Sequence, residues 1–220
     1  MENLEYGTPQ NITVKSSFTD DVKAFYTSDF KDIVFTFFKN PINGILQIFE
    51  NPSKKAYSHA LILYASVAVL YVIGGLLLAG DRRGYMDFAD YLKIALFPVL
   101  TMLGISILSF GVKSVTGQIN IKDELLTGAL CGIPLGLLIP GMLIAKILGT
   151  DNVLMFLMNP SSGGGIIVLL LFLYVFLMMI NVFQQSLKSA QSNDTLAWYL
   201  SPLCVSMAVY LASKISMNLF

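Results

Sequence analysis

The stretch FFKNPINGILQIFENPSKKAYSHA, residues 37–60, carries two Asn-Pro steps and leads directly into a long apolar run. A residue that precedes proline is driven out of the α-helical region, so Asn40-Pro41 and Asn51-Pro52 are each expected to end a helix. Proline is also favoured in the first turn of the helix that follows it. The stretch therefore predicts two short helices separated by corners, followed by a third helix that enters the membrane.

The two short helices are expected to be amphipathic, because aromatic and aliphatic residues recur at helical spacing on one face of each. We expect this region to cover residues 28–57, with Ser28 as the N-cap, after a mobile polar tail at residues 1–27. Such faces suit the bilayer interface, and packing against the protein's own spans is the alternative. The residues assigned to the interface are Phe30, Phe37, Phe38, Pro41, Phe49 and Pro52.

The composition is that of a membrane protein. Hydrophobic residues make up 55% of the chain and charged residues 13%, and the mean hydropathy is +0.69. A soluble domain has about 25% charged residues. The 14 basic and 14 acidic residues balance, which argues against nucleic acid as a partner because phosphate binding needs a basic surface.

Apolar segments long enough to cross a hydrocarbon core of about 30 Å follow the second corner. The chain is therefore predicted to be all-α and polytopic, with five transmembrane helices. Cys131 and Cys204 lie inside these segments and are expected to be free thiols. The predicted spans are residues 58–80, 91–112, 125–148, 164–183 and 197–218.

The orientation rests on the distribution of basic residues. Lys54 and Lys55 flank the first span, which usually dominates the positive-inside rule. They favour a cytoplasmic N-terminus, whereas the Asp81-Arg82-Arg83 turn argues for the opposite orientation.

Glycines recur at four-residue spacing in the third span, in the sequence GALCGIPLG. Small residues on one face let another helix approach closely, and packing drives helix association in lipid. A tightly packed, kinked helix is one interpretation, and a broken helix beside a substrate path is the other. The helix-packing residues are Gly128, Gly132, Gly136, Pro134 and Pro140.

Chemistry-bearing residues are scarce inside the predicted spans. Asn181 and Gln184 end the fourth span and are candidates for polar contacts between helices, or they simply mark the membrane boundary. We interpret Glu124 as part of a solvated helix start and His59, the one histidine, as an interfacial residue. The chain lacks a Gly-x-Ser-x-Gly elbow, a phosphate loop and a His-Glu-x-x-His pair, so we expect no catalytic residues, cofactor or metal site, and no enzyme activity.

The order of these segments resembles that of the Yip domain family, the Ypt/Rab-interacting membrane proteins and their bacterial relatives. The resemblance runs from FFKNPINGILQIFENPSKKA through GQINIKDELLTGALCGIPLGLL to NVFQQSLKSAQSNDTLAWYLSP, and covers residues 35–218. In this family a proline-bearing aromatic segment precedes the spans. A polar segment with glycine, here Gly117, then leads into a span with a Tyr/Gly-x-x-Pro step, to which Gly132-Ile133-Pro134 is matched here.

The resemblance implies a five-span protein with a cytoplasmic N-terminus. Members with a long cytoplasmic region are linked to Rab-type GTPases and vesicle traffic. The short polar start of this chain fits a bacterial inner-membrane member instead, so GTPase binding is doubtful and no GTPase-contact residue is assigned.

Two functions remain open after this comparison. The first is membrane organisation or scaffolding through contacts with lipid, another membrane protein or a second copy, assembled through the glycine face. The alternative is a transporter or channel with a path beside the kinked third span, lined by Thr101, Ser106 and Asn181.

Overall fold

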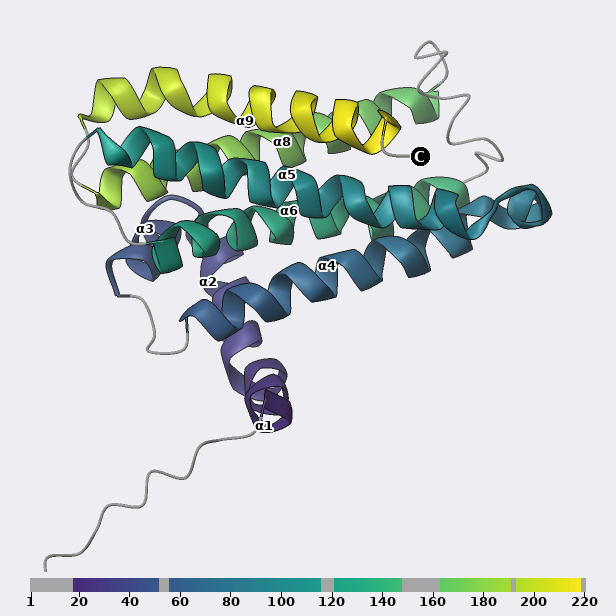
Figure 1. The fold of residues 1–220 in the computed structure, drawn as a ribbon, viewed down its shortest axis with the longest axis horizontal. Coiled ribbons are helices and arrows are strands. Elements are labelled where there is room, and N and C mark those ends of the chain that lie inside the picture. Colours follow the sequence, from purple (N-terminus) through teal and green to yellow (C-terminus); the bar gives the residue numbers. More distant parts are fainter. Residues whose placement is uncertain (1–17, 52–55, 116–120, 148–162, 191–192, 219–220) are drawn as a thin grey trace, which may run out of the picture.

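The computed structural model describes residues 18–51, 56–115, 121–147, 163–190 and 193–218. Regular secondary structure within these ranges is entirely helical, which confirms the predicted all-α class. The elements are α1 (Phe18–Ala24), a π-helical turn η1 (Phe25–Asp29), α2 (Phe30–Lys39), α3 (Asn43–Glu50), α4 (Ala56–Ala79), a 3-10 turn η2 (Gly80–Tyr85), α5 (Phe88–Ser114), α6 (Ile121–Ile147), α8 (Gly163–Ser189) and α9 (Asp194–Asn218) (Figure 1).

Within the described ranges, five helices are long and apolar enough to cross a membrane, namely α4, α5, α6, α8 and α9. The chain is therefore an integral membrane protein, and each predicted span corresponds to one of these helices. The largest difference in bounds is at the end of α8, which continues to Ser189 instead of stopping at residue 183. The extra turns stay helical because their inner side packs on protein, where Ser186 and Leu187 are buried.

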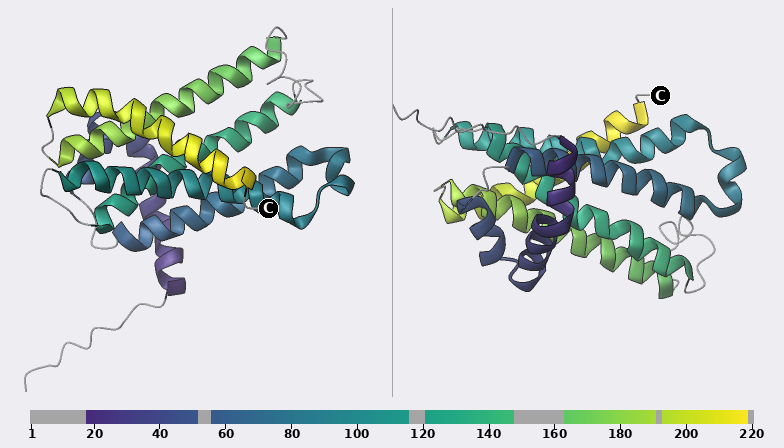
Figure 2. Two further views of the ribbon diagram at one scale, coloured as in Figure 1. Left: turned by 45° about the horizontal axis from the view of Figure 1, so that its top comes forward. Right: turned by 90° about the horizontal axis from the view of Figure 1, so that it is seen from below.

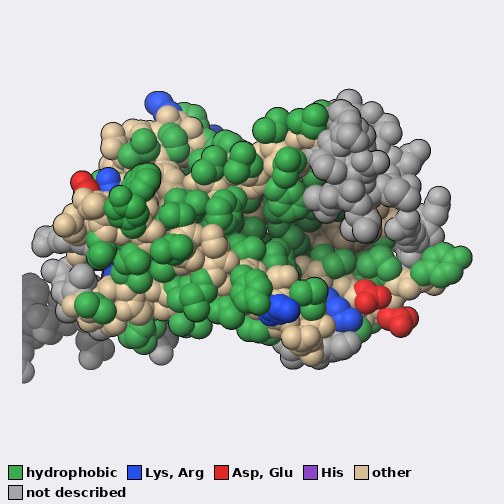
Figure 3. Space-filling view, turned by 90° about the horizontal axis from the view of Figure 1, so that it is seen from above, with side chains coloured by type: hydrophobic (Ala, Val, Ile, Leu, Met, Phe, Trp, Pro, Cys, Tyr) green, Lys and Arg blue, Asp and Glu red, His purple; other side chains and the backbone are tan. Residues whose placement is uncertain are grey.

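The bundle is built around α6, which packs against α4, α5 and α8, while α9 packs against α5 and α8. Much of the surface away from these contacts is apolar. Figure 3 shows one face of the molecule covered mostly by hydrophobic side chains, with few charged groups. An apolar outer surface of this kind suits contact with lipid chains, and it leaves polar contacts to the interior and the ends of the bundle.

The short helices α1 to α3, residues 18–50, form a unit that we call the arm. The arm lies across the long helices near one end of the bundle, which we call the arm end (Figures 1 and 2). The ends of α5 and α8 and the beginnings of α4, α6 and α9 also lie at the arm end.

The arm begins earlier in the chain than the sequence predicted. Residues 18–27 were assigned to a mobile tail, but the structure is helical from Phe18 onward. Phe25 is fully buried, which fixes this segment on the bundle. Ser28 does not cap a helix start, because its hydroxyl donates to the Ala24 carbonyl at 2.9 Å within a continuous helix.

The two corners lie where the prolines place them. Asn40 has φ −141° and ψ 81°, and Asn51 has φ −123° and ψ 62°, so both residues leave the helical region ahead of proline. At the first corner, Asn40 Oδ1 accepts a hydrogen bond from the Asn43 backbone N–H at 3.2 Å. The second corner continues into residues 52–55, so the predicted role of Pro52 lies outside the described residues.

At the end opposite the arm, α4 is closed by a lysine from α6. Lys146 Nζ donates to the carbonyls of Leu77 at 3.0 Å and Leu78 at 3.3 Å. The chain then turns at Gly80, whose φ of +52° lies in the left-handed region that glycine adopts without steric cost. A cation at the last carbonyls of a helix is also favourable with respect to the helix dipole.

Candidate functional site at the arm end

A buried polar cluster joins three long helices at the arm end. The last turns of α5 supply Ser109 and Lys113, the first turns of α6 supply Glu124 and Thr127, and the end of α8 supplies Ser186. Lys113 is 4% exposed and Glu124 is 3% exposed, although both belong to residue types that are almost never fully buried unless paired. We call these five residues the polar cluster.

The centre of the polar cluster is an ion pair. Lys113 Nζ lies 2.8 Å from Glu124 Oε1, and the Ser109 hydroxyl donates to Glu124 Oε2 at 2.5 Å. Both carboxylate oxygens therefore have a partner. A buried ion pair is stable only where further hydrogen bonds satisfy the remaining polar atoms, and Ser109 contributes one of these bonds.

The ion pair is tied to α8 through hydroxyl groups. Lys113 Nζ donates to Ser186 Oγ at 2.8 Å, and Ser186 Oγ lies 2.6 Å from Thr127 Oγ1. From the arm, the ring of Phe49 lies with its centroid 6.0 Å from Lys113 Nζ, at the outer limit of a cation–π contact. The polar cluster therefore connects α5, α6 and α8 and lies against the arm.

This arrangement corrects the interpretation of Glu124 as a solvated helix start. The carboxylate is buried because α6 begins at Ile121, α8 extends past residue 183, and the two helices meet α5 over these turns. A signal for this pair was present in the sequence, since a lysine ends one span and a glutamate begins the next. Opposite charges on either side of a short connection are brought together when the two helices pack antiparallel.

Asn181 fastens the arm to α8 and does not bridge two spans. Its Nδ2 donates to the Pro41 carbonyl at 2.5 Å, across the first corner of the arm. Its Oδ1 accepts from Gln185 Nε2 at 3.1 Å, one turn along α8. Gln184, the other predicted polar contact, instead lines a hollow between α8 and α9.

A second attachment of the arm uses His59, at the beginning of α4. His59 Nε2 lies 3.0 Å from Asp29 Oδ2 of η1, and the rings of His59 and Phe25 have centroids 5.0 Å apart. His59 is buried, so its interpretation as an interfacial residue is wrong. The same segment contacts α4 once more, where the hydroxyls of Tyr26 and Ser66 bond to each other.

The aromatic residues assigned to the bilayer interface divide between two environments. Phe37 is fully buried and packs in the protein core, so its assignment to the interface is wrong. Phe30 and Phe49 are half-buried against the same core, which favours the alternative of packing against the spans. Phe38 and Pro41 are exposed. Most of the apolar face of α2 that the sequence assigned to lipid thus packs on the protein, and only its edge at Phe38 is exposed.

The glycine face of α6 is filled within the chain. A Cβ atom added to Gly128 would lie 2.2 Å from the Met102 carbonyl oxygen, and one added to Gly132 would lie 2.6 Å from Met102 Cε. One added to Gly136 would make only an ordinary contact, at 3.4 Å from Leu70 Cδ2. The face expected to assemble with another copy therefore packs on α4 and α5 of the same chain. On the same helix, Pro134 is buried and Pro140 is exposed.

The hydroxyls proposed for a transport path are engaged with protein groups. The Ser106 hydroxyl lies 3.0 Å from the Tyr64 hydroxyl, and Thr101 donates to the Phe97 carbonyl at 2.9 Å within its own helix. Both residues are buried. In the structure both hydroxyls therefore bond to groups of the protein itself.

Among the residues that the structure describes, no three of His, Cys, Asp and Glu gather closely enough to hold a metal ion. The polar cluster fixes the ends of three helices by charge and hydrogen bonds where lipid-facing helices would have only apolar contacts. Comparison of the chain with protein families, with curated proteins and with solved structures found no match.

Proposed function

We propose that this protein is a non-catalytic membrane protein of the Yip-domain type that organises its membrane through contacts with lipid and with other membrane proteins. Support for the family comes from the order of the aromatic Asn-Pro segment, the Gly-Ile-Pro span and the polar turn before the last span. The working surface in this proposal is the outer face of the arm, which is held at a fixed place on the bundle.

The observation that carries the proposal is the contrast between the two faces of α2. Its inner face buries Phe37, while its outer face exposes 61% of Phe35 and 39% of Phe38. Lys39 places its Nζ over the Phe35 ring, 5.3 Å from the ring centroid. Exposed aromatic side chains next to lysines, on a helix lying across the spans, are typical of helices in the bilayer interface.

The arm is attached firmly enough to hold this surface in place. Asn181 bonds to the corner at Pro41, His59 pairs with Asp29, and Phe25 is buried against the His59 ring. A helix attached at two points adds little ordering cost when it meets lipid, because its position is already fixed.

For location, we propose the bacterial cytoplasmic membrane with the arm on the cytoplasmic leaflet. The lysines that flank the first span support this orientation. Basic residues beside the membrane are also attracted to anionic lipids of that leaflet, by about 1 kcal/mol each.

The experiment measures the depth of single positions on α2. Cys131 and Cys204 are changed to alanine, and a cysteine is introduced in place of Phe35, Phe38 or Asp32. Each variant is labelled with the environment-sensitive dye NBD and reconstituted in nanodiscs. Quenching is then compared between lipids with a nitroxide near the headgroup and soluble iodide.

We expect lipid nitroxides to quench the dye at positions 35 and 38, and iodide to quench it at Asp32, which is exposed on the charged edge of α2. Equal quenching by iodide at all three positions would place the outer face in water and refute an interfacial arm. Asp32 serves as the matched control because it lies on the same helix and differs only in the edge that it occupies.

A further inference from the structure

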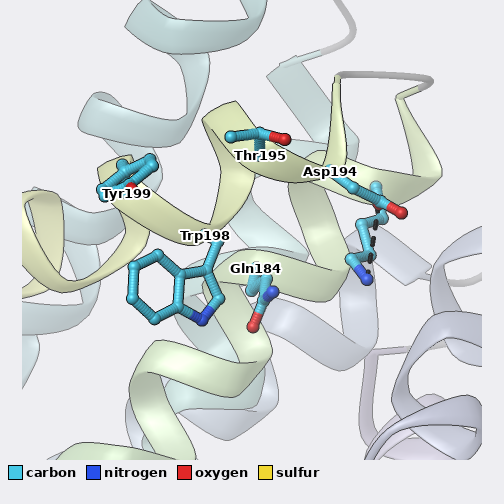
Figure 4. Close-up of a pocket in the computed structure, with 6 residues that line it drawn as sticks. Gln184, Asp194, Thr195, Trp198 and Tyr199 are labelled. Carbon is cyan, nitrogen blue, oxygen red and sulfur yellow. Dashed lines mark ion pairs between the residues drawn. The ribbon is translucent and has the colours of Figure 1, made fainter.

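A hollow with a volume of about 420 Å³ opens at the arm end, between the last turns of α8 and the first turns of α9. It is separate from the arm and from the polar cluster. Small-molecule sites have volumes of about 300–1,000 Å³, so the hollow has room for a compact polar group. Its walls are formed by Gln184, Lys188, Asp194, Thr195, Trp198 and Tyr199 (Figure 4).

One side of the hollow carries a pair of opposite charges. Lys188 Nζ lies 3.4 Å from Asp194 Oδ1, and the two side chains are 28% and 79% exposed. Because an exposed ion pair contributes only about 0–1 kcal/mol, a ligand can share its two charges at little cost. A ligand with both an anionic group and an ammonium group can place the anion on Lys188 and the ammonium on Asp194.

The other side of the hollow is aromatic. Trp198 and Tyr199 are each 62% exposed, and their rings are 4.9 Å apart at an interplanar angle of 88°. In Figure 4, Gln184 lies between the indole of Trp198 and the ion pair of Asp194. The face of an indole attracts ammonium groups, and the amide of Gln184 is a donor suited to phosphate oxygens.

The place of the hollow in the bundle points to lipid. At the arm end α8 ends and α9 begins, and the hollow lies at this point. The ends of apolar spans lie at the level of the lipid headgroups in a bilayer. From the hollow toward the middle of the bundle, the same faces of α8 and α9 continue with Leu177 and Leu203, both exposed. A molecule with its polar part in the hollow would therefore lay hydrocarbon chains along these leucines.

We propose that this hollow binds the headgroup of one zwitterionic phospholipid, of the phosphatidylethanolamine type. Lys188 and the amide of Gln184 hold the phosphate, and Asp194 and the face of Trp198 hold the ammonium group. The two formal charges of the site sum to zero, so it favours a headgroup that is itself neutral overall. Phosphatidylglycerol would bring a phosphate to Lys188 but would leave Asp194 without a cation.

Interfacial tryptophan and tyrosine also contact lipid without binding it, so the experiment must separate a site from general contact. Trp198 is the single tryptophan of the chain, which makes intrinsic fluorescence a reporter for the hollow alone. The purified full chain in detergent is titrated with short-chain phosphatidylethanolamine, with short-chain phosphatidylglycerol and with free phosphoethanolamine.

We expect a saturable change in emission with phosphatidylethanolamine, and binding of phosphatidylglycerol that is about tenfold weaker, because one charge-assisted contact is lost. Free phosphoethanolamine should bind weakly, since the leucines contribute nothing to it. A change in emission that does not saturate and is equal for both lipids would mean that the hollow is ordinary interfacial surface and not a binding site. Equal affinity for phosphoethanolamine would make the ligand a soluble zwitterion and refute the lipid assignment.

Two variants test whether Asp194 binds the ammonium group and Lys188 the phosphate. Asp194→Asn should lose the preference for phosphatidylethanolamine, so that phosphatidylglycerol binds at least as well, whereas Lys188→Gln should weaken both by about tenfold. Lys214→Gln, near the other end of α9, is the control and should match the original chain. All three should keep the original elution volume and helical content. If both charge variants keep the original lipid preference, the ion pair is not part of a headgroup site.

Discussion

Removing the lysine of the buried ion pair tests the polar cluster most directly. In Lys113→Met the side chain keeps a similar length but loses its ammonium group. In the structure the Glu124 side chain is only 3% exposed. Without the ammonium group, the contact of its carboxylate within the polar cluster is the Ser109 hydroxyl. We expect this variant to be strongly destabilised, because a charge is left buried without its counter-charge.

The magnitude follows from the burial of both partners. Removing one member of a buried, hydrogen-bonded ion pair costs about 3–5 kcal/mol in the free energy of unfolding. Glu124→Gln should lie at the lower end of this range, because the Lys113 ammonium keeps its contacts with Ser186 and with the Phe49 ring. When both changes are combined no charge is left unpaired, so the double variant should lose only about 1 kcal/mol.

The assay is reversible unfolding of the purified chain in mixed micelles, followed by far-ultraviolet circular dichroism and by the fluorescence of Trp198. The two single variants and the double variant form a thermodynamic cycle, whose coupling energy should reach about 2 kcal/mol or more. Lys93→Met is the matched control. Lys93 pairs with Asp90 at 3.7 Å with both side chains partly exposed, so its loss should cost less than about 1 kcal/mol.

One result would refute the reasoning. If Lys113→Met and Lys93→Met lower the free energy of unfolding equally, water reaches the Glu124 carboxylate and the polar cluster is not buried. Additive single variants would have the same meaning, because a coupled pair cannot give independent losses.

Other predictions use pairs of neighbouring positions on one helix. Gly128→Ala should destabilise the chain by about 1–3 kcal/mol in the same assay, because the added methyl meets the Met102 carbonyl, whereas Gly136→Ala should change little. Both variants showing the same stability would contradict the packing of α6. Phe37→Ala should cost about 3–5 kcal/mol because its ring is fully buried, and Phe38→Ala much less. The reverse order would mean that α2 is rotated in the membrane.

The corners and the spans could be predicted from the sequence because their causes are local. Proline acts on the residue directly before it, which is why Asn40 and Asn51 leave the helical region where expected. A long apolar run likewise needs no distant partner to become a helix in lipid, where every backbone polar group must be satisfied within the segment.

The early start of the arm also had a signal in the sequence. Val22, Phe25 and Tyr26 follow the i, i+3, i+4 spacing of a helical face. The polar composition around them favoured a tail, but Phe25 is covered by His59 and the segment is helical. Burial of one aromatic ring outweighed the average polarity of its neighbours, because a packed phenylalanine contributes about 1.5–3 kcal/mol.

The polar cluster and the orientation of the arm depend on residues that are distant in sequence. Lys113 bonds to Ser186, and Asn181 bonds to Pro41, so no window around either residue contains its partner. Phe37 and Phe38 are equally aromatic, and which one points inward depends on the helix that α2 meets. Periodicity identifies an apolar face, but only tertiary contacts decide whether lipid or protein covers it.

The polar end of α8 connects these features and explains why a boundary was expected there. Around this part of the helix, Ser186 faces the polar cluster, Asn181 reaches the arm, and Gln184 and Lys188 face the hollow. In a helix surrounded by lipid, such a run of polar groups would mark the membrane surface. Here Ser186 and Asn181 bond to other elements of the protein, and Gln184 and Lys188 lie beside the first turns of α9, so the helix continues to Ser189. The same residues that limit a span in sequence therefore organise the end of the bundle in the fold.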